Sequence, residues 1–511
     1  MRHGIVYLIG AGPGDPGLLT LKGRECLKKA EVVIYDYLAN PVLLAMAPQS
    51  AEKIYVGKTR GKHHLPQEQI NQLLVDRAAQ GKRVARLKGG DPYVFGRGGE
   101  EASVLHRNGI AFEVVPGVTA GFAAAAYAGI PLTHRDVTTS LAMLTGHERP
   151  ERRLSSLDWD KLANGIGTLV FYMGMTNLKL ISSELIKHGR APDTPVAVVQ
   201  WATLPRQKTL VGTLRSISDD VVRQGIEPPA VIIIGEVVRF RDQLRWYDNL
   251  PLFGRRFLLT RPREQAAAFA QLLQQQGAET ICIPTIEIAP PESWQALDDA
   301  LRQLNSFDGL ILTSANGVDS LFARLAAGRM DVRSLAGIEL IAVGTKTAQA
   351  IERHGVRPDL VPDDFRAEGI VAALLAQGVA GKRFLYPRAE LVRPLLIEQL
   401  RQAGAEVTAP VAYRTVRPEK GREMIRHLLE AGEIDAICLS SSSTFDNLQA
   451  MLGAELKTLL GRAELFSIGP LTSATIRKHG YEVALEPETS TLDDLVAAMI
   501  AYYQSKPKTN V

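Results

Sequence analysis

The stretch VYLIGAGPGDPGLLTLKG, residues 6–23, joins an apolar strand pattern to a glycine-rich turn. A strand that runs into glycines is typical of nucleotide and cofactor sites in α/β proteins. Here, however, Asp15 stands where the third glycine of a G-x-G-x-x-G fingerprint belongs. Pro13 and Pro16 also remove backbone N–H donors that a bound pyrophosphate would need. The turn therefore indicates an α/β fold whose ligand is not a dinucleotide.

A second glycine cluster, RLKGGDPYVFGRGGEE at residues 86–101, follows another strand pattern. It again holds Asp-Pro inside the turn, at residues 91–92, and it ends in Glu100-Glu101 where a phosphate loop would have Lys-Ser or Lys-Thr. Acidic residues beside donor-poor turns favour a cationic ligand. S-adenosylmethionine, with its sulfonium and ammonium groups, is such a ligand, and a purely structural turn is the alternative.

Length and composition bound the class of protein. A chain of 511 residues is long enough for more than one domain, and its formal net charge of +4 gives no reason to expect a nucleic-acid partner. Three cysteines lie far apart, which argues against a disulfide framework or a structural zinc site. Neither a signal-peptide pattern nor an apolar run long enough for a membrane span is present. We expect a cytoplasmic protein without a membrane or metal role.

Short apolar runs alternate with amphipathic patterns along the chain, which is typical of α/β domains. Strands are expected at residues 6–9, 32–35, 84–87, 168–172, 196–199 and 231–234, and helices at residues 67–79 and 178–187. The segment RWYDNLPLFGRR, residues 245–256, lacks clear periodicity. We place the domain boundary there, with a linker at residues 246–253.

The second half contains an internal duplication. GRRFLLTRPREQAAAFAQLLQQQGAET from Gly254 aligns without a gap with GKRFLYPRAELVRPLLIEQLRQAGAEV from Gly381. At the same offset, FDGLILTSANGV from Phe307 aligns with IDAICLSSSSTF from Ile434. Further on, VGTKTAQAIERHGV aligns with IGPLTSATIRKHGY. The duplication predicts two similar α/β lobes with a cleft for a small ligand.

Residues 4–245 resemble the uroporphyrinogen-III C-methyltransferases of the tetrapyrrole methylase class. The motifs are GAGPGDPGLLTLKG, VVIYDYL, YVGKTRG, RLKGGDPYVFGRGGEE, VVPGVTA and YMGM, in that order. The resemblance implies two α/β subdomains, S-adenosylmethionine bound between them, S-adenosylhomocysteine as a product, and a homodimer formed through this half. By similarity, the donor would contact Pro13, Gly89, Gly90, Asp91, Val94, Thr119, Ala120, Met173 and Ala202.

The reaction of that family places methyl groups on two pyrrole carbons of uroporphyrinogen III and gives precorrin-2. Because the pyrrole carbon is itself nucleophilic, the enzyme has mainly to align it with the methyl group and then assist loss of a proton. Asp36 and Lys58 resemble the family's acid–base pair; a strand-end cap and a solvated cation are the alternatives. Cations are expected to bind the substrate carboxylates, with Arg60 and Arg97 as first candidates. Lys62, His63, His64, His134 and Arg135 are further candidates.

Residues 254–505 resemble uroporphyrinogen-III synthase through LLTRP, LTSANGV, VAYRT and SIGPLTSATI. The resemblance implies two lobes: residues 254–288 and 412–505 together build one, and residues 289–411 build the other. It also implies that this half closes the ring of hydroxymethylbilane without a cofactor. Tyr413 would help water to leave. Hydroxyl-rich turns would hold substrate carboxylates, with ordinary helix capping as the alternative. The residues proposed for this are Thr313, Ser314, Ser441 and Thr472.

Together the two halves predict a bifunctional tetrapyrrole enzyme that supplies sirohaem or cobalamin synthesis. One rival is a related methylase that acts on another precorrin carbon or on RNA. The other makes the C-terminal half a sensor that binds a tetrapyrrole without turnover. A cyclisation assay separates the sensor from the synthase.

Overall fold

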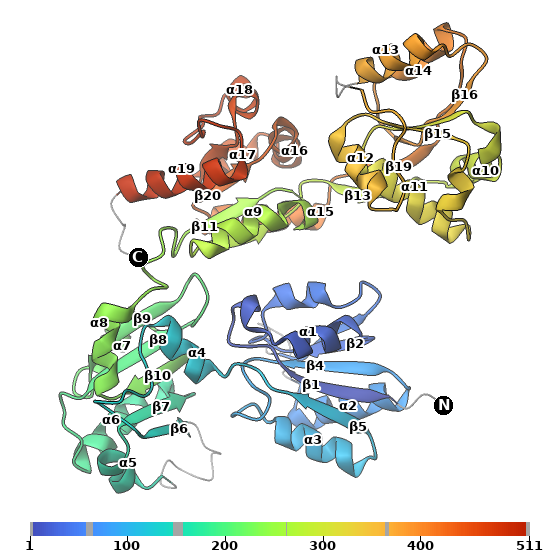
Figure 1. Ribbon diagram of the computed structural model, residues 1–511. Coiled ribbons are helices and arrows are strands. Elements are labelled where there is room, and N and C mark those ends of the chain that lie inside the picture. Colours follow the sequence, from blue (N-terminus) through green and yellow to red (C-terminus); the bar gives the residue numbers. More distant parts are fainter. Residues whose placement is uncertain (1–3, 58–64, 147–156, 262, 363–366, 507–511) are drawn as a thin grey trace. The chain divides into compact units, whose positions relative to one another are not determined.

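The computed structural model describes residues 4–57, 65–146, 157–261, 263–362 and 367–506. By its internal contacts the chain forms two units, built mainly on residues 1–257 and mainly on residues 281–495 (Figure 1). The first unit contains two sheets that follow one another along the chain, and the second half contains three smaller sheets.

The first sheet is parallel, with strand order β3-β2-β4-β1-β5. Its strands are β1 (Ile5–Gly10), β2 (Val32–Tyr35), β3 (Glu52–Tyr55), β4 (Arg83–Lys88) and β5 (Ala111–Val115). Alternate strand residues enter two separate cores, as the two-residue period of a strand requires. Ile9 packs with α1 (Leu21–Lys28), whereas Leu8 packs with α2 (Gln67–Ala79) and α3 (Gly98–Arg107). Helices therefore cover both faces (Figure 1).

The second sheet is mixed, with strand order β6-β7-β10-β8-β9. Its strands are β6 (Leu141–Thr145), β7 (Thr168–Tyr172), β8 (Pro195–Gln200), β9 (Lys208–Thr213) and β10 (Ala230–Ile234). Phe171 packs on the face covered by α5 (Trp159–Gly165), α6 (Leu178–Lys187) and α7 (Ile217–Arg223). Val170 packs on the other face, against α4 (Ala120–Tyr127). Helix α8 (Arg241–Leu244) follows this sheet.

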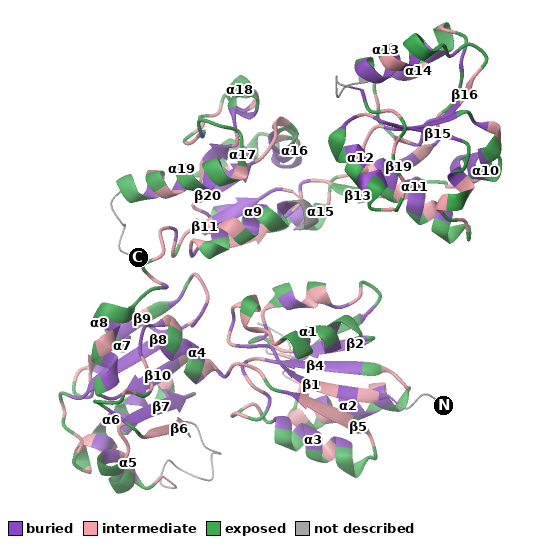
Figure 2. Ribbon diagram, viewed as in Figure 1, coloured by how far each residue is buried: buried purple, intermediate pink, exposed green. Residues whose placement is uncertain are grey.

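The periodicity predicted these elements closely. The expected strands at 32–35 and 168–172 and the expected helices at 67–79 and 178–187 have the bounds that the sequence suggests. The other four expected strands are present and extend one residue further at one or both ends. The α/β class is confirmed. Buried residues run along the strands of both sheets (Figure 2).

The second half contains two four-stranded sheets in the described residues, ordered β12-β11-β20-β21 and β18-β16-β14-β15. The strands of the first are β11 (Arg256–Leu259), β12 (Glu279–Cys282), β20 (Ala436–Leu439) and β21 (Glu464–Ser467). Those of the second are β14 (Gly309–Leu312), β15 (Glu339–Ala342), β16 (Arg383–Leu385) and β18 (Glu406–Thr408). Each strand of one sheet matches, in the duplicated sequence, the strand at the same place in the other. The duplication therefore describes two equivalent sheets that each combine strands distant in the chain.

A third small sheet, β13-β19-β17, completes this half. Its strands are β13 (Glu287–Ala289), β17 (Arg388–Ala389) and β19 (Val411–Val416). The helices are α9 (Arg263–Gln275), α10 (Gln295–Arg302), α11 (Ala315–Ala327), α12 (Thr345–Glu352), α13 (Ala367–Gln377), α14 (Leu395–Gln402), α15 (Glu419–Glu430), α16 (Ser442–Leu452), α17 (Glu455–Leu460), α18 (Pro470–Lys478) and α19 (Leu492–Ser505). The predicted domain and lobe boundaries stay predictions.

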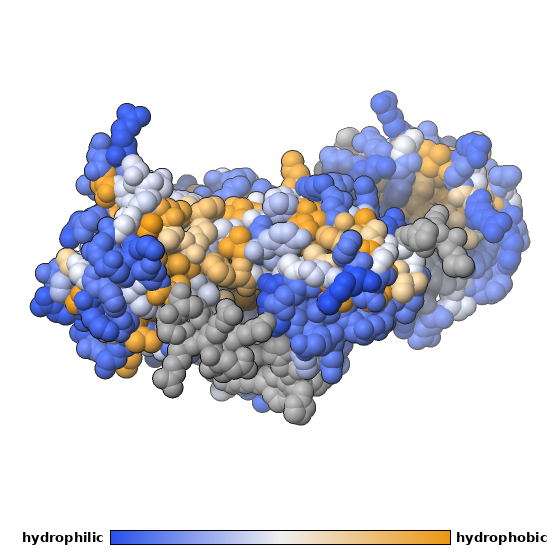
Figure 3. Space-filling model, turned by 90° about the horizontal axis from the view of Figure 1, so that it is seen from below, coloured by the Kyte–Doolittle hydropathy of each residue, from blue (hydrophilic) through white to orange (hydrophobic). Residues whose placement is uncertain are grey.

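The surface of the N-terminal half exposes several large apolar side chains, among them Tyr37, Leu38, Tyr93, Phe95, Phe122 and Met173. Figure 3 shows apolar side chains gathered on one face of this half. Exposed apolar patches often mark binding surfaces. None of the helices in the described residues has the length and apolarity that a membrane span requires.

Candidate functional site

The two glycine-rich turns lie against each other at the carboxyl ends of β1 and β4. Gly12 and Gly90 exchange backbone hydrogen bonds, at 3.2 Å for Gly12 N to Gly90 O and 2.7 Å for the return bond. A Cβ atom on Gly10 would lie 2.5 Å from Cα of Gly117, in the segment that precedes α4. Only glycine allows this approach of three backbone segments. The glycines that the sequence singles out therefore build one cradle.

The two aspartates of these turns hold backbone groups of the fold. Asp15 accepts a hydrogen bond from Gly17 N at 2.7 Å. Asp91 accepts one from Tyr93 N at 2.8 Å and, through its other oxygen, one from Gly117 N at 3.0 Å. Asp91 therefore ties the second turn to the segment before α4. Both carboxylates therefore stabilise the loops by accepting backbone hydrogen bonds, in addition to any contact with a cation.

The residues predicted to contact the donor come from both sheets. Val94 and Ala120 pack on the apolar cluster that contains Ala202. The hydroxyl of Thr119 lies 2.8 Å from that of Tyr172. The next residue, Met173, is half exposed. These are small or apolar groups around a backbone cradle, next to the turn that contains Pro13. The structure thus brings together side chains that lie far apart in the sequence.

Asp36 follows β2 and lies beside the same cradle. One of its oxygens accepts a hydrogen bond from Leu38 N at 3.2 Å, as a strand-end cap does. The other accepts from Nη2 of Arg86 at 3.0 Å. A Cβ atom on Gly89 would lie 2.5 Å from Cβ of Leu38, so the loop after Asp36 touches the second turn. Asp36 is partly exposed, whereas Arg86, with which it forms an ion pair, is buried.

Arg86 belongs to a buried ionic network that the sequence analysis did not identify. Its Nε lies 3.2 Å from Oε1 of Glu101, and Nζ of Lys88 lies 2.9 Å from the same oxygen. Glu101 is fully buried, and both cations are nearly so. Burial, with the neighbouring Arg86, lowers the pKa of Lys88, while Glu101 opposes that shift. A single buried carboxylate therefore supports the two cations behind Asp36.

The predicted substrate cations are only partly described. Lys58, Arg60, Lys62, His63 and His64 lie outside the described residues. Arg97 is exposed and forms a two-point ion pair with Glu100, at 2.7 Å and 3.0 Å. His134 stacks on Phe240 with ring centroids 4.4 Å apart. Arg97 would therefore have to share or leave Glu100 in order to hold a substrate carboxylate.

In the second half, three of the predicted residues meet at the carboxyl end of β14. Ser314 caps α11 by accepting from Gly317 N at 3.0 Å, and its hydroxyl lies 2.9 Å from that of Tyr413. The hydroxyl of Thr313 lies 3.2 Å from that of Tyr386, which the sequence analysis missed. Burial raises the pKa of Tyr386. Two hydrogen-bonded pairs, Thr313 with Tyr386 and Ser314 with Tyr413, thus form a cluster of four hydroxyls at this strand end.

The other two predicted hydroxyls lie on the other four-stranded sheet. Ser441 caps α16 in a capping box with Thr444, whose Oγ1 accepts from Ser441 N at 3.3 Å. Thr472 is buried in α18. Helix capping, the alternative for these hydroxyls, is therefore what the structure displays at Ser314 and Ser441. A role in carboxylate binding stays a prediction.

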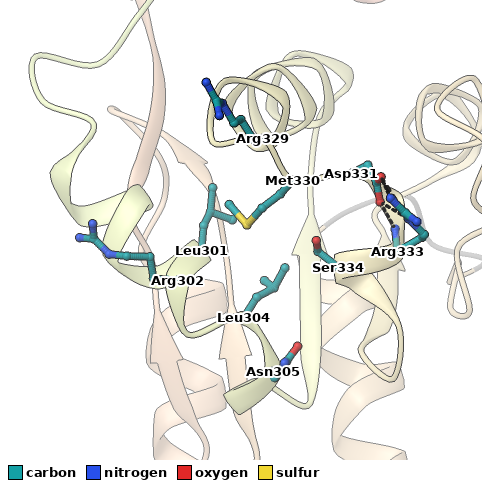
Figure 4. Close-up of a pocket in the computed structure, with 9 residues that line it drawn as sticks. All are labelled: Leu301, Arg302, Leu304, Asn305, Arg329, Met330, Asp331, Arg333 and Ser334. Atoms are coloured by element: carbon teal, nitrogen blue, oxygen red, sulfur yellow. Dashed lines mark hydrogen bonds and ion pairs between the residues drawn. The ribbon is translucent and has the colours of Figure 1, made fainter.

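The second half also contains a cavity of about 570 Å³ (Figure 4). Its lining residues are Leu301, Arg302, Leu304, Asn305, Arg329, Met330, Asp331, Arg333 and Ser334. They precede β14 and β15 in the chain and so lie at the amino ends of these strands, whereas Thr313 follows β14. Arg302 and Arg333 are already paired with carboxylates. The cavity is not the predicted substrate site.

The sequence carried little signal for Arg86, Lys88, Glu101 and Tyr172. Charged residues in a strand and in a first helical turn usually face solvent, and a strand tyrosine usually packs. The only available hint was position, because each lies within or beside a quoted motif. Their roles depend on which strands become neighbours.

Comparison with known proteins agrees with the motifs. A family model described as Tetrapyrrole (Corrin/Porphyrin) Methylases matches residues 5–218, and one described as Uroporphyrinogen-III synthase HemD matches residues 267–497. The porphyrin biosynthesis protein HemD of Ruminiclostridium josui is 35% identical over 501 residues, which cover 98% of each chain. The chain belongs to the family of fused tetrapyrrole methylases and uroporphyrinogen-III synthases. It is a bifunctional enzyme of tetrapyrrole biosynthesis.

One further relative and one solved structure are also similar to this chain. A uroporphyrinogen-III C-methyltransferase of Bacillus subtilis is 43% identical over 373 residues, or 73% of this chain and 76% of the relative. A solved structure of uroporphyrin-III C-methyltransferase from Thermus thermophilus, complexed with S-adenosylhomocysteine, is 44% identical. It covers 46% of this chain and 98% of its own, with a TM-score of 0.40.

Proposed function

We propose that the N-terminal half transfers methyl groups from S-adenosylmethionine to two pyrrole carbons of uroporphyrinogen III, and that the C-terminal half forms that substrate from hydroxymethylbilane. The observation that supports the first activity best is the cradle of Gly12, Gly90 and Gly117, surrounded by the small residues of both sheets. The product, precorrin-2, would supply sirohaem or cobalamin synthesis.

The residues present fit the proposed methyl donor. Val94, Ala120 and Ala202 offer apolar contacts for an adenine ring, and the glycine cradle lets the ligand approach the backbone. The turns lack the donor-rich pattern of a phosphate site, which suits a ligand without phosphate. When bound, S-adenosylmethionine supplies an electrophilic methyl group.

Asp36 is the proposed base. The pyrrole carbon needs alignment, and the cationic pyrroline that follows must lose a proton from a bridging carbon. A partly exposed carboxylate next to the cradle can accept that proton. Arg86 holds one oxygen and Leu38 N the other, so that the carboxylate has one orientation. Lys58 stays a proposed partner.

Asp91→Ala is expected to weaken S-adenosylmethionine binding at least about tenfold, or roughly 1.4 kcal/mol. The variant loses the hydrogen bond that Gly117 N donates to Asp91, so the second turn is no longer tied to the segment before α4. Calorimetric titration of the full chain measures this. Asp193→Ala, which changes an exposed aspartate, is the control and should bind normally. Wild-type affinity in a folded Asp91→Ala protein would contradict the donor site.

For the second half, Tyr413→Phe is expected to slow formation of the type III isomer about tenfold or more and to raise the share of type I. The variant loses the hydroxyl that lies 2.9 Å from that of Ser314, while the ring still packs. Chromatographic isomer analysis is required because hydroxymethylbilane also closes spontaneously to type I. Tyr481→Phe, on a partly buried tyrosine elsewhere, is the control.

If the wild-type chain binds hydroxymethylbilane and yields only type I product, the sensor alternative replaces the synthase proposal. The hydrogen-bonded hydroxyl cluster around Tyr413 favours turnover, because it places a proton donor in a defined geometry.

We also propose a homodimer formed through the methyltransferase half. Apolar side chains gather on one face of this half (Figure 3) and support this proposal. Phe122, for example, is 50% exposed. Light scattering coupled to gel filtration tests it. A monomer at all accessible concentrations would exclude the dimer.

A further inference from the structure

The segment that follows the second sheet is packed against the loops of the proposed donor site. Residues 241–248, which we call the strap, include α8 and the turn after it. Trp246 and Tyr247 of the strap form an aromatic cluster with Tyr127, the last residue of α4. Ring centroids are 5.0 Å apart for Trp246 and Tyr127 and 4.8 Å apart for Tyr247 and Tyr127. The first residues of the predicted linker thus pack against α4.

The strap supplies hydrogen bonds to the carboxyl end of α4. Arg241 donates to the carbonyl of Ala128 at 2.6 Å, and Nε1 of Trp246 donates to that of Ala126 at 3.0 Å. Asp248 forms an ion pair with Arg241. Terminal carbonyls of a helix have no partner within it, so these donors fix the end of α4. The other end of α4 begins at Ala120, a residue proposed to contact the donor.

The strap contacts the 201–204 loop directly and is connected to the Asp15 turn through Tyr127. Tyr127 donates to a carboxylate oxygen of Asp15 at 2.6 Å, and the hydroxyl of Thr203 accepts from Asp15 N at 2.9 Å. Tyr247 donates to the carbonyl of Thr203 at 3.0 Å. A Cβ atom on Gly14 would lie 3.2 Å from the carbonyl oxygen of Ala202, so the loops touch. One continuous chain of contacts therefore joins the strap to the turn that contains Pro13.

The loop at residues 201–204 requires such support. Trp201 and Thr203 have φ values of +49° and +70°, which are rarely adopted by residues other than glycine. Strained backbone of this kind persists only where surrounding contacts determine it. Gln207 accepts from Thr203 N at 2.9 Å and donates to the carbonyl of Tyr127 at 3.3 Å. Thr203 is thereby bonded to Asp15, Gln207 and Tyr247.

We propose that Tyr127, Trp246 and Tyr247 are positioning residues for the methyl donor: the strap holds the Asp15 turn against the 201–204 loop and so sets donor affinity. This inference rests on the proposed donor site. The three residues act through Asp15, Thr203 and α4, and none is assigned a part in the methyl transfer itself. Loosening the strap should therefore raise the donor KM and leave the rate at saturating donor almost unchanged.

The test uses the full chain with the variants Tyr127→Phe, Tyr247→Phe and Trp246→Phe, each of which removes one hydrogen bond and keeps an aromatic ring. Binding of S-adenosylhomocysteine is measured by calorimetry, and kcat and KM are measured for methyl transfer. Tyr127→Phe should weaken binding and raise the donor KM about tenfold, with kcat within about twofold. Smaller increases in the same direction are expected for the other two. Leu244→Ala, a half-exposed strap residue, is the matched control and should behave as wild type.

Two results would overturn the inference while leaving the proposed function intact. One is wild-type affinity in both Tyr127→Phe and Tyr247→Phe when the wild type binds the ligand. The other is a fall in kcat without a rise in the donor KM, which would indicate a role in the reaction. Failure of the wild-type chain to bind S-adenosylhomocysteine would instead contradict the proposed donor site, and the inference with it.

Discussion

Asp36→Ala is expected to lower methyl transfer about 10²-fold or more while leaving the affinity for the donor nearly unchanged. The variant removes the carboxylate proposed to accept the proton from the substrate. It also leaves the Nη2 group of Arg86 without its partner, which lies 3.0 Å away in the wild type. Donor binding should persist because the glycine cradle and the Asp91 contacts are unaffected. Single-turnover methyl transfer with bound donor measures the chemical step.

Asp36→Asn separates the charge of Asp36 from its role as a strand-end cap. The amide oxygen can still accept from Leu38 N, so the turn should survive while the base is lost. We therefore expect the same loss of turnover in Asn and Ala variants. Wild-type turnover in Asp36→Asn would reduce Asp36 to a cap. Lys58→Ala should show the same separation between binding and turnover if Lys58 is the partner.

Glu101→Ala is expected to destabilise the methylase half by about 3–5 kcal/mol, the usual cost of removing one partner from a buried ion pair. Glu101 is fully buried and accepts from both Arg86 and Lys88. Without it, two cations remain buried; Arg86 keeps its ion pair with Asp36, whereas Lys88 loses its ion pair with Glu101. The variant also leaves a cavity. Urea unfolding followed by tryptophan fluorescence is a suitable measurement, because Trp159, Trp201 and Trp246 report on this half.

The neighbouring Glu100 provides a matched control. Its ion pair with Arg97 is about half exposed on both sides, and such surface pairs contribute about 0–1 kcal/mol. Glu100→Ala should therefore leave the unfolding midpoint almost unchanged. Equal effects of the two substitutions would contradict the assignment of Glu101 as the central carboxylate of the network.

The sequence predicted the individual helices and strands better than the tertiary contacts between them. The strand at 32–35 and the helix at 67–79 follow from local periodicity, which depends only on nearby residues. The sequence also points to the aspartates of the two turns, as acidic groups that suit a cationic ligand. The structure adds that Asp15 and Asp91 each accept hydrogen bonds from backbone N–H groups.

The predicted linker also shows that local patterns do not predict tertiary packing. Residues 246–253 lack periodicity, and the structure indeed gives them no helix or strand. Yet Tyr247 and Leu252 are buried. Missing periodicity predicts missing regular structure, and it says nothing about packing, because burial depends on which distant surface is available.

By itself, the sequence determined the α/β class, the glycine turns, the duplicated half and the family, since all are patterns of residue type along the chain. Only the tertiary structure decided that Arg86 supports Asp36, fifty positions away, and that Tyr127 binds Asp15 across 112 positions. Such pairs form because sheet order brings particular strand ends together. A hydrogen bond depends on distance and direction in space, and no local periodicity encodes either for residues that far apart.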